Sequence, residues 1–452
     1  MKLVLIKPYY EAYMLTPSLG LGYLASYMKK NGIDVVIIDA VRDNLSNDKV
    51  LEIIRKENPD AVGISCLSAF YSHCVELALL IKQAGFKTII GGVHPTFLPY
   101  QTLIDTKADY VVCGEGEIAM TKLALNNFVN DNIQGVYSLE NLQSADTPTA
   151  RGEIVHNLDE IPFPDWEQLR PDLFPPSPMG TIAKGYPVGI IMSTRGCPYP
   201  CVFCASPNFY QKKVRFRSPE NVVDEIEYLI KRFKIKELQF MDDNLIYNRE
   251  HAVKICNLIL ERNIKINWSC PNGVRADKLD KELAELMKKA GCYLVTFGIE
   301  TANPQVLSNI KKSETIEQIK DAIFVANKAG LLTQGSFVLG LPGETKETIE
   351  ETIQFAKKMP LDRALFTIMD ILPGCELWYK YDGMFTPNLS LTSFNKPAWI
   401  PEGLTEDYLL KAQGRALREF YSRPKIFYNM VKYLRFTQIK FLFRRLFLYK
   451  VI

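Results

Sequence analysis

The sequence predicts two α/β units in series, a doubly wound parallel sheet followed by a partial (β/α)6 barrel, with a helical region at the end. Three observations support this prediction. Short apolar runs alternate with helical patterns in two separate stretches of the chain, as βαβ units require. A proline-rich stretch without such patterns lies between them. The length of 452 residues also exceeds what one compact core usually holds.

We expect four parts, which span residues 1–139, 140–187, 188–380 and 381–452. In the first part, strands are predicted at residues 3–7, 34–39, 61–65, 87–91 and 110–113, and helices at 20–31, 48–57, 72–83 and 99–106. Ligands of parallel sheets bind at the carboxyl ends of the strands. Small residues stand there, including Ser65, Gly91 and Gly114, and they leave room for a flat ligand to approach the backbone.

The second part is irregular. Prolines gather in its segments Ile161–Trp166 and Phe174–Pro178. Because proline fixes the backbone and removes a hydrogen-bond donor, we expect an extended, semi-rigid linker. Its aromatic side chains are expected to pack at the junction of the two units.

In the third part the alternation resumes. Strands are predicted at residues 188–194, 237–241, 265–269, 293–298, 332–339 and 363–371, and helices at 222–234, 249–261, 278–290, 315–329 and 345–358. Polar residues and glycines follow these strands, at Asp242, Asp243, Arg275, Glu300, Gly340 and Gly343. Barrels of this kind place their chemistry at that end.

The loop after the first barrel strand carries three cysteines, Cys197, Cys201 and Cys204. Pro198 and Pro200 keep this loop out of a helix. Three thiolates at the carboxyl end of a strand favour an iron–sulfur cluster, and three ligands leave one iron of a four-iron cluster open to a substrate. A zinc site would need a fourth close ligand, and none follows before His251 and Cys256. A disulfide framework is unusual in a long chain without a secretory segment.

The Cys-x3-Cys-x2-Cys spacing, with Phe203 before the last cysteine, resembles the cluster loop of the radical S-adenosylmethionine (SAM) superfamily. The resemblance implies that Cys197, Cys201 and Cys204 hold a [4Fe–4S] cluster whose open iron chelates SAM, with Phe203 against the adenine. It also implies the reaction: an electron from the cluster cleaves the sulfonium, and the resulting 5′-deoxyadenosyl radical abstracts hydrogen from a carbon atom.

A zwitterionic cofactor needs an arginine for its carboxylate and a carboxylate for its amine or ribose hydroxyls. Arg275 and Glu300 suit these roles and resemble family positions. Asp242 is either a further SAM contact or the cap of the following helix, and we leave both interpretations open. Gly340 resembles a glycine that lets the adenine lie close to the backbone, although a plain turn before a helix would have the same sequence.

Three segments together resemble the cobalamin-binding domain that is fused to many radical SAM enzymes: Thr16–Ala25, Gly91–Thr96 and Gly114–Glu117. The resemblance implies cobalamin contacts at Ser18, Ser65, Gly91, Gly92, His94, Gly114 and Glu115. The D-x-H-x-x-G motif of other cobalamin proteins is missing, which leaves open that the domain has lost cobalamin. His94 could equally be a turn histidine capped by the backbone. Cys66 and Cys113 are either small buried side chains or ligands of a second cluster.

The basic charge of the chain is concentrated in its tail. From Lys411 to the end, eleven Lys or Arg stand against one acid, a local charge of +10 in a chain of net charge +3. From Pro424 to Phe447 aromatic residues are mixed with Lys and Arg, and apolar residues recur near helical spacing. Basic amphipathic helices of this kind can lie in the headgroup layer of an anionic membrane. Packing of this face on the barrel is the alternative, and nucleic acid is less favoured because no RNA-binding module is apparent.

The resemblance covers nearly the whole chain and implies a cobalamin-dependent enzyme that methylates a carbon atom of a hydrophobic or lipid-like small molecule. The alternatives are a radical oxidative cyclase, like that of bacteriochlorophyll biosynthesis, an RNA-modifying enzyme, or a non-catalytic iron–sulfur protein. A mere electron carrier would not need Arg275 and Glu300. The expected electron donor is a flavodoxin or ferredoxin. Because the sequence shows neither a signal peptide nor a run of ~18 apolar residues, we expect a cytoplasmic enzyme. Whether its basic tail contacts the inner face of the membrane is left open.

Overall fold

The computed structural model describes residues 1–11, 15–145, 147, 149–175, 183–387, 389, 397–424, 426 and 428. The chain divides into two compact units. The first comprises Met1–Leu173 with the short segment Leu372–Gly374, and the second begins at Phe174. The part of the predicted linker up to Leu173 therefore packs within the first unit, and residues 176–182 lie outside the described residues.

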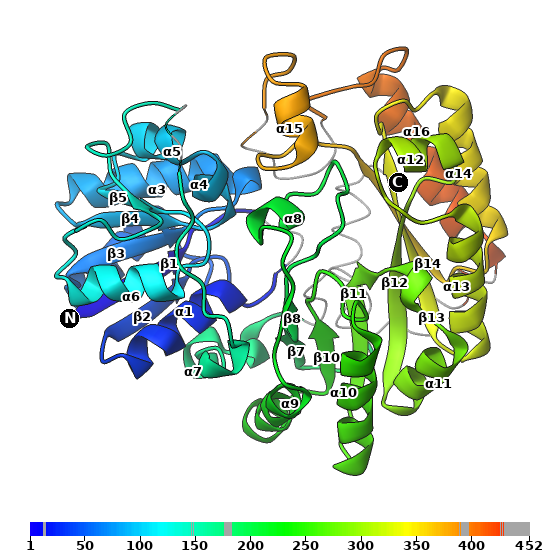
Figure 1. The fold of residues 1–452 in the computed structure, drawn as a ribbon, viewed down its shortest axis with the longest axis horizontal. Helices are drawn as coiled ribbons and strands as arrows, with labels where there is room; N and C mark the ends of the chain where they lie inside the picture. The colour runs from blue at the N-terminus through cyan, green and yellow to red at the C-terminus, as the bar shows by residue number, and fades with distance from the viewer. Residues whose placement is uncertain are drawn as a thin grey trace. The chain divides into compact units, whose positions relative to one another are not determined.

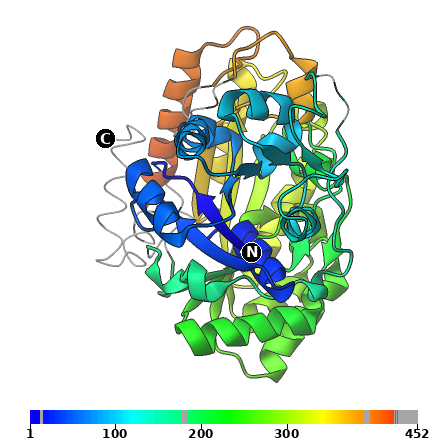
Figure 2. The same ribbon diagram turned by 90° about the vertical axis from the view of Figure 1, so that its left-hand side faces the viewer.

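The first unit is a six-stranded sheet with helices on both faces (Figures 1 and 2). Its strands are β1 (Lys2–Lys7), β2 (Asp34–Asp39), β3 (Ala61–Ser65), β4 (Thr88–Gly91), β5 (Tyr110–Val112) and β6 (Val136–Tyr137). Its longer helices are α1 (Leu19–Lys30), α2 (Asn47–Glu57), α3 (Tyr71–Gln83), α5 (Pro99–Thr106) and α6 (Glu117–Leu125). The order is β2-β1-β3-β4-β5-β6, and only β6 pairs antiparallel. The order reverses between β1 and β3, which is where such sheets bind ligands.

The strands of the first unit are continuous apolar runs because both faces of the sheet are covered. Residues 3–6 of β1, for example, are all at most 1% exposed. The predicted strands and helices agree with the structure to within two residues. Three α-helices of the described part of this unit were not predicted, namely α6 and the short helices α4 (Val93–Phe97) and α7 (Trp166–Leu169), nor was the short strand β6. The α6 segment is buried on most sides and lacks an amphipathic pattern, and α4 contains Pro95.

The second unit is an open barrel of six parallel strands in the order β14-β13-β12-β11-β10-β7 (Figure 1). These strands are β7 (Val188–Ile191), β10 (Glu237–Phe240), β11 (Asn267–Val274), β12 (Cys292–Glu300), β13 (Leu332–Leu339) and β14 (Arg363–Ile368). The crossover helices are α9 (Pro219–Phe233), α10 (Arg249–Glu261), α11 (Lys281–Lys289), α13 (Ile316–Lys328) and α14 (Lys346–Lys358). The predicted fold class, a doubly wound sheet followed by a partial barrel, is confirmed.

Three strand ends differ from the prediction by three residues or more, and one of them is that of β14, which ends at Ile368 instead of residue 371. The first barrel strand ends at Ile191, because the next residues form β8 (Thr194–Arg195), which pairs antiparallel with β9 (Arg215–Phe216). The cysteine loop thus lies in the segment that connects these two paired strands. The predicted end of the third strand at residue 269 is also wrong: β11 continues to Val274 through an irregular register.

The open edge of the barrel sheet is covered by α16 (Glu406–Tyr421), which lies beside β14. The Gln413 amide donates to Phe366 O at 2.9 Å, and the Tyr421 hydroxyl donates to Ala364 O at 2.8 Å. These side chains satisfy backbone carbonyls that an uncovered edge strand would expose. Smaller helices complete the unit, α8 (Ser206–Phe209), α12 (Pro304–Asn309) and α15 (Glu376–Lys380).

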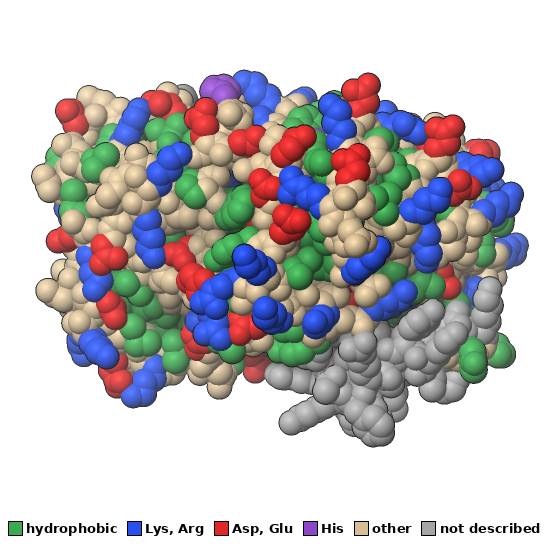
Figure 3. All heavy atoms as spheres, turned by 90° about the horizontal axis from the view of Figure 1, so that it is seen from below, with side chains coloured by type: hydrophobic (Ala, Val, Ile, Leu, Met, Phe, Trp, Pro, Cys, Tyr) green, Lys and Arg blue, Asp and Glu red, His purple; other side chains and the backbone are tan. Residues whose placement is uncertain are grey.

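The predicted amphipathic segment from Pro424 to Phe447 lies almost wholly outside the described residues. Among the helices that the structure describes, none combines the length and the apolar character that crossing a membrane requires. Figure 3 shows Lys and Arg side chains interspersed with Asp and Glu over the described part of one face. Exposed pairs such as Arg262–Asp224, at 2.6 Å, each contribute only about 0–1 kcal/mol, so these charges do not decide the fold.

Candidate functional site

The cysteine loop presents three thiols that are only partly buried. Cys197, Cys201 and Cys204 are of intermediate exposure, whereas the seven other cysteines of the chain are buried. The loop begins with Gly196 at φ 105°, and a Cβ there would lie 2.1 Å from Lys213 O. Only glycine allows this close approach of the two ends of the loop. A tight turn, in which Cys204 N donates to Cys201 O at 3.1 Å, then brings the last two cysteines together.

The donor set suits an iron–sulfur cluster better than a single metal ion. No group of three or more His, Cys, Asp or Glu within the described residues could share one ion. A four-iron cluster instead binds each cysteine to a different iron, so its ligands are spread more widely. Burial raises the pKa of all three thiols, that of Cys204 to about 12. These thiols are therefore protonated at neutral pH until a metal binds them.

Asp242 and Asp243 brace the two ends of the cysteine loop. The buried Asp242 carboxylate accepts hydrogen bonds from Ser193 Oγ at 2.6 Å, from Thr194 Oγ1 at 2.7 Å and from Ser193 N at 3.1 Å. Asp243 accepts from Ser206 Oγ, two residues beyond the last cysteine, at 2.6 Å. The alternative of a helix cap is wrong for Asp242, because the α10 cap is Asn248. Both oxygens of Asp242 bind the loop instead of facing an open site.

Arg275 follows β11 directly, and its guanidinium is engaged within the protein. It donates to Lys312 O at 2.8 Å, to Ser313 O at 2.7 Å and to Asp277 Oδ1 at 2.9 Å. Its Cζ also lies 3.7 Å from the ring centroid of Tyr199, in the cysteine loop. These bonds use three of the five N–H groups of the guanidinium and join the 312–313 segment to the cysteine loop. The role of Arg275 at a cofactor carboxylate stays a prediction.

Glu300 ends β12 and lies in a buried network of charges. Its backbone is left-handed, with φ 65°, and its Oε1 is 2.9 Å from Lys312 Nζ. Lys312 Nζ is also 3.7 Å from Glu314 Oε2. Burial alone would lower the pKa of Lys312, but Glu300 and Glu314 outweigh this effect and raise it, so the ammonium stays charged. Sequence reasoning missed Lys312, because a lysine after a short helix gives no signal of its own.

The turn after β13 is organised by Glu344. Gly340 has φ 87°, and its N–H donates to Glu344 Oε2 at 2.6 Å, while Leu341 N donates to the same oxygen at 3.0 Å. Glu344 thus holds the backbone of Gly340, which is the predicted contact of the adenine. Sequence reasoning assigned no role to Glu344. Burial raises the pKa of Glu344 to about 7. Phe203, the other predicted adenine contact, is half-buried.

We predict that Glu344 makes the stability of the protein depend on pH. Since the folded pKa of about 7 lies above the ordinary 4.5, the contribution of the neutral acid is complete below pH 4.5. It is lost as pH rises through 7, by about 3 kcal/mol at most. Glu344→Gln keeps an acceptor for Gly340 N and cannot ionise. Urea unfolding should show that the difference between the variant and the wild type grows between pH 5 and pH 8. Parallel pH profiles of the two proteins would contradict this role.

In the first unit, the predicted cobalamin residues lie at one edge of the sheet. Ser65 ends β3 beside Gly91, its register partner at the end of β4. Gly92 has φ 112°, and a Cβ there would lie 2.6 Å from Cys66 O. Gly114, at φ 91°, follows β5 and precedes the half-buried Glu115. Ser18 stands at the start of α1, where it makes no side-chain cap. A ligand could therefore approach the backbone at successive strand ends.

His94 belongs to the core of the first unit. Its Nδ1 is 3.1 Å from Ser68 Oγ, and its ring stacks on Tyr71 with 3.9 Å between centroids. The side chain is fully buried, and burial lowers its pKa to about 4, so it is neutral at pH 7. Cys66 and Cys113 are also fully buried in the apolar core of the first unit. The structure thus favours the buried alternative for all three residues.

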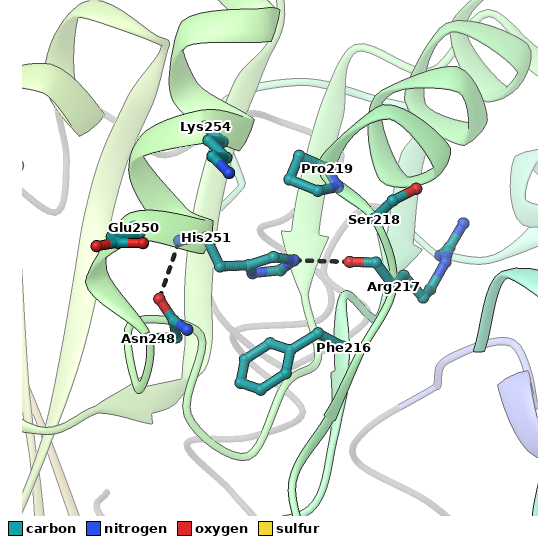
Figure 4. A pocket seen from close by; sticks show the side chains of 8 residues that line it. All are labelled: Phe216, Arg217, Ser218, Pro219, Asn248, Glu250, His251 and Lys254. Carbon is teal, nitrogen blue, oxygen red and sulfur yellow. Dashed lines mark hydrogen bonds between the residues drawn. The ribbon is translucent and has the colours of Figure 1, made fainter. Parts of the chain in front are cut away.

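A cavity of about 320 Å³ lies between the beginnings of α9 and α10 (Figure 4). It is lined by Phe216, Arg217, Ser218, Pro219, Asn248, Glu250, His251 and Lys254. The hydrogen bond between His251 Nε2 and Arg217 O connects the two walls, while the bond from His251 N to Asn248 Oδ1 caps the start of α10. None of the predicted cofactor-binding residues lines this cavity.

Comparison with known proteins agrees with the division of the chain into two units. Residues 191–356 match the Radical SAM superfamily profile, and residues 10–124 match the B12 binding domain profile. An uncharacterised methyltransferase of Pyrococcus horikoshii is 34% identical over 419 residues, which cover 91% of this chain and 89% of the relative. The anaerobic magnesium-protoporphyrin IX monomethyl ester cyclase of Rubrivivax gelatinosus is 30% identical over 90% of this chain and 74% of its own. Among solved structures, the radical SAM methyltransferase TsrM of Kitasatospora setae, which contains cobalamin and a [4Fe–4S] cluster, superposes with a TM-score of 0.74. The match covers 92% of this chain and 90% of TsrM at 17% identity, and it supports the fold.

Proposed function

Because the chain belongs to the radical SAM superfamily and carries a B12-binding domain ahead of its radical SAM domain, we propose that it methylates a carbon atom of a hydrophobic small molecule. The protein is an enzyme of the cobalamin-dependent radical SAM methyltransferase type, and its cofactors are a [4Fe–4S] cluster, SAM and cobalamin. The observation that carries the proposal is the loop with three partly exposed thiols at the carboxyl edge of the barrel.

We assign the cluster to Cys197, Cys201 and Cys204. When bound, the cluster supplies the electron that cleaves SAM, and cobalamin supplies a carrier for the methyl group. The protein holds the cysteine loop in place through Asp242 at its beginning and Asp243 at its end. Glu300, whose carboxylate lies at the carboxyl end of β12, is the group we assign to the SAM amine or ribose.

The cobalamin site is assigned to the edge formed by the ends of β3, β4 and β5. Gly92 and Gly114 keep the backbone bare at this edge, as a large flat ring requires. Ser18, Ser65, Gly91 and Glu115 stand at the same ends of strands and helices. In this proposal His94 supports the edge from the core, because its ring is buried against Tyr71.

The substrate is proposed to be apolar. The support is indirect: the related cyclase of Rubrivivax gelatinosus is named for magnesium-protoporphyrin IX monomethyl ester, a large flat molecule. The same relative favours a second candidate, an oxidative cyclisation or rearrangement without methyl transfer. Three further expectations remain predictions. They are a flavodoxin or ferredoxin as the electron donor, contact of the basic tail with a membrane, and a cytoplasmic location.

The test is an anaerobic assay of reconstituted full-length protein with SAM labelled by deuterium in its methyl group. A methyltransferase is expected to form 5′-deoxyadenosine and S-adenosylhomocysteine, and to place the label in an extracted pigment or lipid. A product that has lost hydrogen and carries no label would favour the cyclase. Absence of 5′-deoxyadenosine from protein that carries a four-iron cluster would refute both proposals.

We predict that Gly92→Ala prevents cobalamin binding, whereas Gly414→Ala on α16 does not. At Gly92 the backbone has φ 112° and ψ −166°, a conformation that is nearly exclusive to glycine and costs other residues about 1–3 kcal/mol. The added methyl group would also press on Cys66 O. At Gly414 the nearest atom to an added Cβ is Arg418 Nη1, the end of a flexible side chain, 3.4 Å away. Cobalamin content after reconstitution, read from its visible spectrum, should fall only in the Gly92 variant. Equal cobalamin content in both variants would contradict the assigned site.

A further inference from the structure

A buried pair of opposite charges, Lys312 and Glu300, lies beside the cysteine loop, and the proposed function gives Lys312 no role. Lys312 and Glu300 are 8% and 7% exposed, and their charged atoms are 2.9 Å apart. Lys312 lies two residues after Ile310, whose carbonyl accepts from Val202 N at 3.1 Å, next to Cys201. Arg275, which binds the Lys312 carbonyl at 2.8 Å, also lies 3.7 Å from the ring centroid of Tyr199 in the cysteine loop.

The position of this pair is fixed from several sides. Arg275 holds the Lys312 and Ser313 carbonyls at 2.8 Å and 2.7 Å, and Glu314 accepts from Ala276 N at 2.6 Å. Glu300 is fixed by its left-handed backbone. Two fixed charges at low exposure act on a neighbouring site far more strongly than solvated charges do.

We propose that Lys312 and Glu300 set the reduction potential of the cluster, with Lys312 raising it and Glu300 lowering it. The physical reason is that reduction adds one negative charge, which a nearby ammonium stabilises and a nearby carboxylate destabilises. Net charge around a cluster is one of the factors that set its potential. Lys312 is therefore a positioning and electrostatic residue, not a ligand. The inference rests on the proposed assignment of the cluster to Cys197, Cys201 and Cys204.

The experiment is a redox titration of the anaerobically reconstituted full-length protein, followed by electron paramagnetic resonance and carried out without SAM. Lys312→Met should lower the midpoint potential, and Glu300→Gln should raise it. Each change should shift the ratio of reduced to oxidised cluster about tenfold at a fixed potential, which is 59 mV for a one-electron couple. The double variant should return towards the wild type, and Lys312→Arg should remain close to it.

The preceding residue, Lys311, provides a control for overall charge. Lys311 pairs with Glu376 at 2.7 Å, but both side chains are about half exposed, so Lys311→Met should leave the potential unchanged. Shifts of the same sign in Lys312→Met and Glu300→Gln, no shift in either, or an equal shift in Lys311→Met would overturn the inference. Should Lys312→Met fail to hold a cluster, Glu300→Gln decides alone: a raised potential supports the inference, and an unchanged or lowered one refutes it. A wild type that assembles no cluster would instead refute the proposed function.

Discussion

Replacement of Cys201 by alanine is expected to abolish both the four-iron spectrum and the cleavage of SAM. Cys201 lies between the other two cysteines in the loop, and its neighbour Val202 holds this part of the loop by donating from its N to Ile310 O at 3.1 Å. With two cysteines left, the cluster would lose one of its three protein ligands and exchange it for water. Anaerobic reconstitution, iron and sulfide analysis, and assay of 5′-deoxyadenosine measure the effect.

The matched control is Cys256→Ala. Cys256 lies on α10 and is 2% exposed, and burial raises the pKa of its thiol, so it behaves as a small apolar side chain. This variant should keep its iron and its activity and lose only a little stability. A Cys201→Ala protein that retained the wild-type spectrum and activity would remove the basis of the proposed function. Loss of iron in both variants would show that the assay reports general instability.

The parts of this molecule that could be predicted from the sequence are those encoded by local patterns. Apolar runs buried on both faces gave the strands of both sheets, and the spacing of Cys197, Cys201 and Cys204 gave the loop. Where a local pattern was weak, the prediction failed: α6 lacks an amphipathic pattern, and β11 runs through a bulge that no periodicity reveals. The start of α11 is another case. Asp280 caps this helix, which therefore begins at Lys281, three residues later than predicted.

The roles of individual polar residues could not be predicted, because they depend on partners far away in the sequence. Asp242 binds Ser193, 49 residues earlier, and Arg275 binds the Lys312 carbonyl, 37 residues later. Composition and spacing carry no information on such pairs. A carboxylate and an arginine at strand ends suit a zwitterionic cofactor, but they suit the bracing of a loop equally well. Only the tertiary contacts distinguish these roles.

The second large effect is expected from Asp242→Ala. The change removes the acceptor of the Ser193 and Thr194 hydroxyls and of Ser193 N, all of them buried. Leaving such donors without partners costs about 1–3 kcal/mol for each group, so the segment that leads into Cys197 should loosen or rearrange. We expect a marked loss of stability in urea and rapid loss of iron to a chelator from any protein that does assemble a cluster.

Two further variants separate bracing from general damage. Asp242→Asn keeps one acceptor oxygen for the two hydroxyls, and should therefore lose iron at an intermediate rate. Asp243→Ala removes a single, exposed bond to Ser206 at the other end of the loop and should affect iron retention much less. If Asp242→Ala held its cluster as firmly as the wild type does, the loop would not depend on this brace. The buried carboxylate would then have to be explained by a direct contact with SAM, which the SAM affinity of Asp242→Asn would reveal.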